Sequence, residues 1–142
     1  MADDVQGLTV GSSASFSKQV TVEDIVSFAD VTGDHNPLHT DAAYAARTRF
    51  KAPIAHGMLG AGLISAAIGV NLAPGNAVIY MGQNLQFRAP VSAGDILTAN
   101  VEVTELDAEK SRLKLNTTVS NQDGTAVIRG DATIMVEALT DA

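Results

Sequence analysis

Apolar and polar residues alternate through the second half of the chain. Four segments, 78–90, 96–106, 112–121 and 125–136, are rich in β-branched residues, and the period of two is clearest over 98–103. The breaks between the segments contain Gly, Asp, Asn and Ser, which are typical of tight turns. The pattern therefore predicts four sequential strands joined as an antiparallel meander.

The first half of the chain predicts one strand and two short helices. Residues 14–20 alternate like a strand, and Thr21 with Asp24 resembles a helix capping box. Apolar residues then follow at helical spacing up to Gly33, which is placed to end the helix. These are Ile25, Val26, Phe28, Ala29 and Val31. Pro37 interrupts helical structure after that point, so we expect an irregular loop and then a short helix over 41–47.

Residues 57–72 predict a helix that is buried on most sides. The segment has many small residues, lacks charge and ends before Pro74-Gly75. Each glycine costs about 1 kcal/mol of helix propensity, and close approach to a sheet would offset that cost. We therefore expect an α+β fold in which a curved antiparallel sheet wraps around this helix. Such a sheet leaves an edge and a face uncovered, which favours dimerisation.

Composition narrows the class of protein. A chain of 142 residues suits one domain, which we place at 13–142 after a flexible N-terminal segment, 1–12. The net charge of −7 disfavours nucleic acid and anionic membranes as partners. The absence of cysteine excludes disulfides and thiolate chemistry. The apolar stretch 58–73 is too short for a membrane span, and the acidic N-terminus differs from a signal peptide, so a cytoplasmic location is expected.

Asp34 and His39 point most directly to catalysis. They are five positions apart with Pro37 between them, in a stretch where four of six side chains are polar. A carboxylate and an imidazole that hold the same water form an acid–base couple, because histidine titrates near neutral pH. The alternative is structural: Asp34 caps a turn and His39 is an ordinary loop histidine. We expect Asn36 to brace this loop by Asx-type hydrogen bonds.

Two more histidines raise the question of a metal site. His35 and His56 could join Asp34 and His39, and His35 and His39 are four positions apart. Pro37 prevents the helix that would align them, and the chain carries no matching ligand signature. We therefore expect no metal, and we expect His35 to face solvent.

Gly57 is the second candidate anchor. It stands at the predicted N-terminus of the buried helix, where free N–H groups and the helix dipole can stabilise a developing negative charge on oxygen. The alternative is a glycine required only by the turn. Ser65 lies two turns further on, and its hydroxyl can face a ligand or the carbonyl four residues earlier.

A basic cluster interrupts the acidic chain. Arg47, Arg49 and Lys51 supply three of its nine cationic residues. They can bind an anion such as a nucleotide phosphate, or they can form a solvated helix end.

Several segments together resemble a known family. Residues 28–39, with the core D-x-N-P-[apolar]-H, and residues 55–58, Ala-His-Gly-Met, are similar to the (R)-specific enoyl-CoA hydratases of the MaoC-like dehydratase family. Residues 80–87 and 91–95 also resemble its sheet, and the similarity covers about 13–136. The resemblance implies a hotdog fold, a homodimer whose two sheets join, an acyl-CoA substrate and no cofactor.

The resemblance also implies roles for individual residues. Asp34 and His39 would be the catalytic dyad, and the Gly57 amide would bind the thioester carbonyl. The remaining family positions would support the site or line the acyl pocket; these are Asn36, Ser65, Ile68 and Thr133.

Three rival functions remain open from the sequence. One is dehydration of a 3-hydroxyacyl group on an acidic carrier protein, which the net charge disfavours but the basic cluster allows. Another is a dehydratase for a branched or carboxylated acyl-CoA, for which Arg88 would supply the cation. A non-catalytic thioester-binding subunit would have little need for both Asp34 and His39. Chain length and pathway, including polyester synthesis or fatty-acid turnover, stay open.

Overall fold

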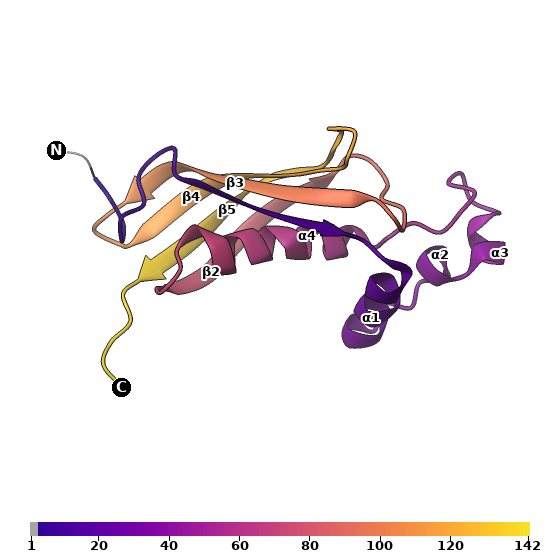
Figure 1. Ribbon diagram of the computed structural model, residues 1–142, viewed down its shortest axis with the longest axis horizontal. Helices are drawn as coiled ribbons and strands as arrows, with labels where there is room; N and C mark the ends of the chain where they lie inside the picture. The colour runs from indigo at the N-terminus through magenta and orange to yellow at the C-terminus, as the bar shows by residue number, and fades with distance from the viewer. Residues whose placement is uncertain (1–2) are drawn as a thin grey trace.

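One antiparallel sheet forms the body of the protein (Figure 1). The computed structural model describes residues 3–142. The strands are β1 (Ser13–Gln19), β2 (Ala77–Phe87), β3 (Ile96–Asp107), β4 (Arg112–Ser120) and β5 (Ala126–Glu137). Their order across the sheet is β1-β3-β4-β5-β2. All five predicted strands are confirmed to within two or three residues at each end.

The predicted meander is wrong for β2. Strands β3, β4 and β5 are sequential neighbours, but β2 pairs with β5 and β1 pairs with β3. Tight hairpins need connections of about two to five residues. Eight residues, 88–95, separate β2 from β3, and they carry the chain to the opposite half of the sheet. As a result β1 and β2 are the two edge strands.

A central helix packs against the sheet, as predicted. Helix α4 (Gly57–Ala66) continues without a break into a π-helical segment, η1 (Ala67–Leu72). Ile64 and Ile68 on this helix are fully buried, together with Leu115 of β4. Figure 1 shows α4 lying along one face of the sheet. The α+β architecture of a curved sheet around a central helix is therefore confirmed.

Close packing accounts for two of the helix glycines. A Cβ atom on Gly57 would lie 2.7 Å from the Phe87 ring, and one on Gly60 would lie 2.9 Å from Ile128. Gly62 and Gly69 face open space instead, with no atom of residues 3–142 within 4 Å of a Cβ. The prediction that the sheet requires small residues is correct for the first pair and wrong for the second.

Helix α1 (Val22–Thr32) begins and ends as the sequence predicts. The Thr21 and Asp24 side chains form both hydrogen bonds of a capping box, and Gly33 ends the helix with a φ of 81°. The Thr21 N–H that donates to Asp24 holds the pKa of that carboxyl below its ordinary value. Val31 and Val26 are exposed rather than part of the buried stripe.

Two helical turns follow α1. The sequence predicted a loop over 34–39, but Pro37–Thr40 form a single turn, α2, with Pro37 at its first position. Proline suits that position, because the first N–H of a helix has no intrahelical partner. The next turn, α3 (Ala42–Ala45), lies inside the predicted short helix. Figure 1 shows α1, α2 and α3 gathered beyond one end of the sheet, opposite the two chain ends.

The segment before β1 contributes to the core. Val5 and Leu8 pair across a tight turn and are buried, so part of the segment assigned as flexible packs with the domain. Residues 1 and 2 lie outside the described part of the chain. The boundary at residue 13 stays a prediction. Within residues 3–142, every helix is too short or too polar to cross a membrane.

Candidate active site

Short-range hydrogen bonds shape the loop between α1 and α2. Asp34 accepts from the Asn36 N–H at 3.2 Å through Oδ1, and Asn36 accepts from the Leu38 N–H at 3.1 Å. The second bond caps α2, which ends close to His39. Asn36 therefore braces the loop as predicted. Asp34 braces it with one carboxylate oxygen and keeps the other for a further partner.

His39 is held through one ring nitrogen. Its Nδ1 lies 2.7 Å from the Ile54 carbonyl oxygen, and the side chain is half-buried. A carbonyl oxygen can only accept, so Nδ1 carries a proton and donates it. The other nitrogen, Nε2, is left for chemistry. The segment before α4 thus orients the imidazole of α2.

A third side chain, His56, contacts both Asp34 and His39. It is the N-cap of α4 and only 3% exposed. Its Nε2 lies 3.0 Å from the main-chain oxygen of Asp34. Its ring stacks on His39 with centroids 3.8 Å apart and planes 30° apart, and Phe28 packs 4.7 Å away. The histidine therefore contacts both members of the predicted dyad.

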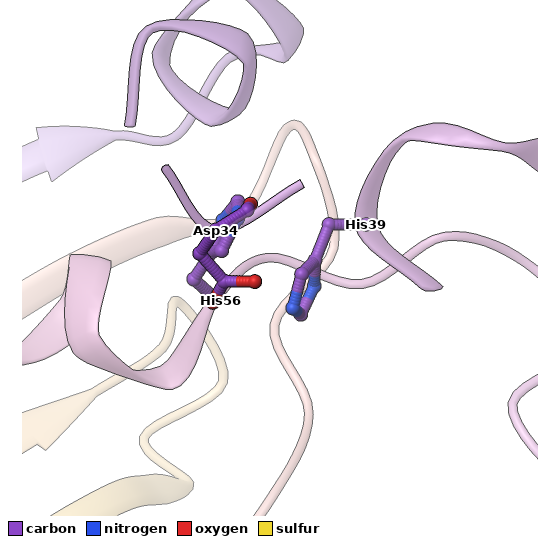
Figure 2. Close-up of side chains that lie close together, drawn as sticks. All are labelled: Asp34, His39 and His56. Carbon is purple, nitrogen blue, oxygen red and sulfur yellow. The ribbon is translucent and has the colours of Figure 1, made fainter. Parts of the chain in front are cut away.

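Asp34, His39 and His56 converge in space (Figure 2). Their candidate ligand atoms all lie within 4.8 Å of one another. Figure 2 shows the Asp34 carboxylate directed toward His39. Hydrogen bonds to water span about 2.8 Å, so one water can contact both Asp34 and His39. The structure thus brings polar atoms of the two residues to within 4.8 Å of each other, which is compatible with a shared water.

The same three residues also carry groups that can bind a metal ion. Histidine binds metals through a lone pair on a ring nitrogen. One nitrogen of each ring is already bound to a main-chain oxygen, Nδ1 of His39 to that of Ile54 and Nε2 of His56 to that of Asp34. The expectation of a site without metal stays a prediction. His35, the fourth residue considered for a metal site, is exposed and lies 3.8 Å from Asp30. Its exposure agrees with the sequence prediction.

A cavity of about 360 Å³ opens beside the cluster. His39, His56 and Gly57 line one side of it. Apolar residues of the sheet and helix line the deeper part, and two arginines, Arg49 and Arg88, also border it. Asp34 is exposed and is not among the lining residues. Asp34 lies next to His39, which does line the cavity.

Gly57 is the first residue of α4 and borders this cavity. The N–H groups of a first helical turn have no intrahelical acceptor, and the helix dipole makes this end positive. The backbone there can therefore donate to an oxygen that gains negative charge. Phe87 covers the glycine from the sheet side, leaving no space for a side chain at position 57.

Other predicted site residues lie elsewhere. Ile68 is 1% exposed and belongs to the core. Thr133 sits between Ala132 and Ile134, which face the helix, so it lies on the outer face of the sheet. Ser65 is exposed on α4. None of the three lines the 360 Å³ cavity formed by residues 3–142.

The three residues of the basic cluster take different places in the structure. Arg49 lines the cavity, with its guanidinium carbon 5.1 Å from the Phe50 ring centroid. Arg47 and Lys51 are exposed and do not line it. Of the three residues, Arg49 is therefore placed to contact a ligand that enters the cavity.

Sequence reasoning missed two residues of this site. His56 was considered as a metal ligand and as part of the motif at residues 55–58, without a role in the site, and Phe87 only as part of a strand. Both contact residues that are far away in the chain: His56 contacts Asp34, and Phe87 packs against Gly57. The signal that could have found His56 is its position directly before the helix-starting glycine.

The chain is similar to proteins of one family. Residues 7–125 match the family described as MaoC like domain. The (R)-specific enoyl-CoA hydratase of Rhodospirillum rubrum is 48% identical over 128 residues, covering 90% of this chain and 88% of the relative. The 3-hydroxybutyryl-CoA dehydratase of Methylorubrum extorquens is 44% identical over 137 residues, covering 96% and 86%.

A solved structure shares the architecture. The (R)-hydratase from A. caviae involved in PHA biosynthesis superimposes with a TM-score of 0.86 at 42% identity. The match covers 92% of this chain and 98% of that one. The hotdog fold implied by the sequence resemblance is confirmed.

Proposed function

The chain belongs to the family of MaoC-like domains, and on that premise we propose that it is an (R)-specific enoyl-CoA hydratase. It adds water to a trans-2-enoyl-CoA to form an (R)-3-hydroxyacyl-CoA, and the reaction is reversible. One observation carries the proposal: polar side-chain atoms of Asp34 and His39 lie within 4.8 Å of each other, beside a cavity that the N-terminus of α4 lines. The relatives with 44–48% identity catalyse this reaction by name, in one direction or the other.

The dyad activates one water. Water has a pKa of about 15.7, so a base must take its proton as its oxygen attacks the β-carbon. The Asp34 carboxylate takes that proton, and the electrons of the carbon–carbon double bond move to the thioester oxygen. His39 then gives the proton on Nε2 to the α-carbon. Transfer of a proton from Asp34 to His39 restores both groups.

The hydrogen bond at Nδ1 suits His39 to the donor role. An imidazolium donates from both nitrogens. With Nδ1–H bound to the Ile54 oxygen, the second N–H points to the reacting side. Asp34 and His39 act on one face of the substrate, so hydroxyl and hydrogen add to the same face.

The N-terminus of α4 stabilises the enolate. The thioester oxygen becomes negative when the β-carbon is attacked, and the Gly57 N–H together with the helix dipole supports that charge. Electron withdrawal comes from the thioester itself, and the reaction is redox-neutral. We therefore propose that it requires no cofactor.

Arg49 is proposed to contact the coenzyme. It borders the cavity and is braced against the Phe50 ring, and a guanidinium binds phosphate oxygens in bidentate fashion. The coenzyme A phosphates then lie at the cavity mouth, with the acyl chain toward the apolar residues Leu97 and Ile128. Acyl-CoA, rather than nucleic acid or a membrane, is the proposed partner, and a reducing cytoplasmic location accords with a chain that lacks cysteine.

The test is hydration of crotonyl-CoA by the purified protein, compared with its Asp34→Asn variant. Asparagine keeps the oxygen that accepts from the Asn36 N–H, so the loop is preserved, but it cannot take a proton. We expect loss of the enoyl absorbance, an (R)-3-hydroxybutyryl product, and a decrease in kcat of about 10²–10⁴-fold in the variant.

Two results would contradict the proposal. An Asp34→Asn variant with wild-type kcat would show that the dyad is misassigned. A folded protein that leaves crotonyl-CoA unchanged but hydrates the same acyl group on a carrier protein would favour the carrier-protein dehydratase instead.

A further inference from the structure

His56 makes more contacts to the proposed dyad than a packing residue requires. Its Nε2–H donates to the main-chain oxygen of Asp34, and its ring stacks on His39. It is also the residue directly before Gly57, at the N-cap of α4. The His56 side chain therefore contacts the loop that carries Asp34 and the ring of His39. It also stands at the start of α4, which carries the Gly57 N–H.

We propose that His56 is a positioning residue that sets the Asp34–His39 pair relative to the N-terminus of α4. The inference rests on the proposed hydratase function. Asp34 is exposed and its loop is anchored mainly by bonds within itself, whereas His56 is 97% buried. The bond from His56 is the one that ties the loop to the central helix. Without it, the carboxylate keeps its local geometry but loses its fixed distance to the oxyanion site.

The stacked ring constrains His39 in a second way. The bond from Nδ1 to Ile54 allows the His39 ring to rotate about that bond. The His56 ring, tilted by 30° with its centroid 3.8 Å away, restricts this rotation, because dispersion contacts favour the stacked arrangement. Nε2 is then directed at the space that it shares with Asp34. Misplacement by about 1 Å can cost about 10²-fold in rate.

A buried atom of His56 argues against a purely structural role. Nδ1 is inaccessible to solvent and has no hydrogen-bond partner within residues 3–142. Such an atom lowers the stability of the fold, and a buried unpaired group calls for an explanation. Phenylalanine would fill the same space between Phe28 and His39 without that atom. Histidine instead supplies the Nε2–H bond to Asp34, which phenylalanine cannot make.

Three variants separate the hydrogen bond from the stack. His56→Phe keeps a stacked ring and loses the donor. His56→Gln extends an amide N–H to the position of Nε2, whereas His56→Asn reaches only to the position of Nδ1. His35→Gln is the matched control, because His35 is an exposed histidine in the same loop that does not contact the dyad.

The measurements are kcat and KM for crotonyl-CoA, the thermal midpoint, and amide hydrogen exchange at Asn36 and Leu38. We expect kcat of His56→Phe to fall by about 10²-fold with little change in KM, and its thermal midpoint to equal or exceed that of the wild type. Its loop amides should exchange faster. His56→Gln should retain more kcat and more amide protection than His56→Asn.

Several outcomes would overturn the inference. Wild-type kcat and wild-type exchange in His56→Phe would show that the bond to Asp34 positions nothing. Equal losses in His56→Gln and His56→Asn, with a lowered thermal midpoint in both, would show a packing role only. If the wild type fails to hydrate crotonyl-CoA, the proposed function fails, and amide exchange still decides whether His56 holds the Asp34 loop.

Discussion

At the scale of residues, His39 and Asp34 each use one polar side-chain atom to hold the side chain in place and leave the other for the reaction. One nitrogen of His39 binds the Ile54 carbonyl, and one oxygen of Asp34 binds the Asn36 N–H. The remaining nitrogen and oxygen are free to share a water. Because the structural atoms hold the side chains, the reacting atoms need little reorganisation when substrate arrives.

The protonation of His39 decides the direction of the pH dependence. With Asp34 as base and His39 as proton donor, activity requires an ionised carboxyl and a protonated imidazole. We therefore expect kcat to fall at alkaline pH, where His39 no longer carries the proton that it must donate. The measurement is kcat for crotonyl-CoA hydration from acid to mildly alkaline pH.

The opposite slope would reverse the assignment. If kcat instead rises toward alkaline pH, neutral His39 is the base. The other charged or titratable groups near His39 are Asp34, His56 and Arg49. His35→Gln should leave the profile unchanged, since His35 is exposed and lies near Asp30.

At the scale of elements, the start of α4 is suited to donate to an oxyanion. His56 has a φ of −59° and a ψ of 134°, and helical geometry begins at Gly57. That change of conformation leaves the N–H of Gly57, the first helical residue, without an intrahelical acceptor. Proline is accepted at the first position of a helix and requires this extended conformation of the preceding residue. Proline at position 57 therefore fits the start of α4 and removes the N–H of that residue.

Gly57→Pro tests the oxyanion donor. Since a Cβ at position 57 would meet the Phe87 ring, the substitution is made together with Phe87→Leu. We expect the double variant to fold and its kcat to fall by about 10²–10³-fold relative to Phe87→Leu alone. Gly57→Ala in the same background keeps the N–H and should retain most of kcat. Equal activity of the proline and alanine variants would remove Gly57 from the mechanism.

At the scale of the whole molecule, one edge of the sheet and one face of the central helix are uncovered. Edge strand β2 exposes Ile79, Tyr80 and Met81, at 44%, 38% and 45% of their surface. The exposed side of α4 and η1 has small residues, Gly62 and Gly69, with open space around them. Exposed apolar edge strands favour pairing with another chain. We propose that a second copy of this chain covers both features.

A lysine on β2 tests the homodimer. Ile79→Lys places a charge at the edge, which opposes strand pairing, and we expect it to cost about 2 kcal/mol or more of dimer stability. Sedimentation equilibrium should give twice the chain mass for the wild type and a concentration-dependent shift toward one chain for the variant. Val10→Lys, also on an exposed residue, is the control and should stay dimeric. A wild-type protein with the mass of one chain would contradict the proposal.

Local patterns anticipated most of the elements. The capping box at Thr21, the stop at Gly33 and the alternation in the four later segments depend on neighbours in the chain, and each produced the expected element. The partner of β2 was not predictable in this way. Its pairing with β5 is decided by which strand completes the sheet around α4, and a connection of eight residues leaves that choice open.

The sequence by itself determined the element types, the burial of the central helix and the identity of Asp34, His39 and Gly57 as candidates, because periodicity and residue chemistry are local properties. Only the tertiary structure decided which atoms face each other. It placed Ile68 in the core and Thr133 on the outer face of the sheet, and it brought His56 into contact with both Asp34 and His39. Those contacts join segments whose approach depends on the packing of α4 against the sheet, which short stretches of sequence do not encode.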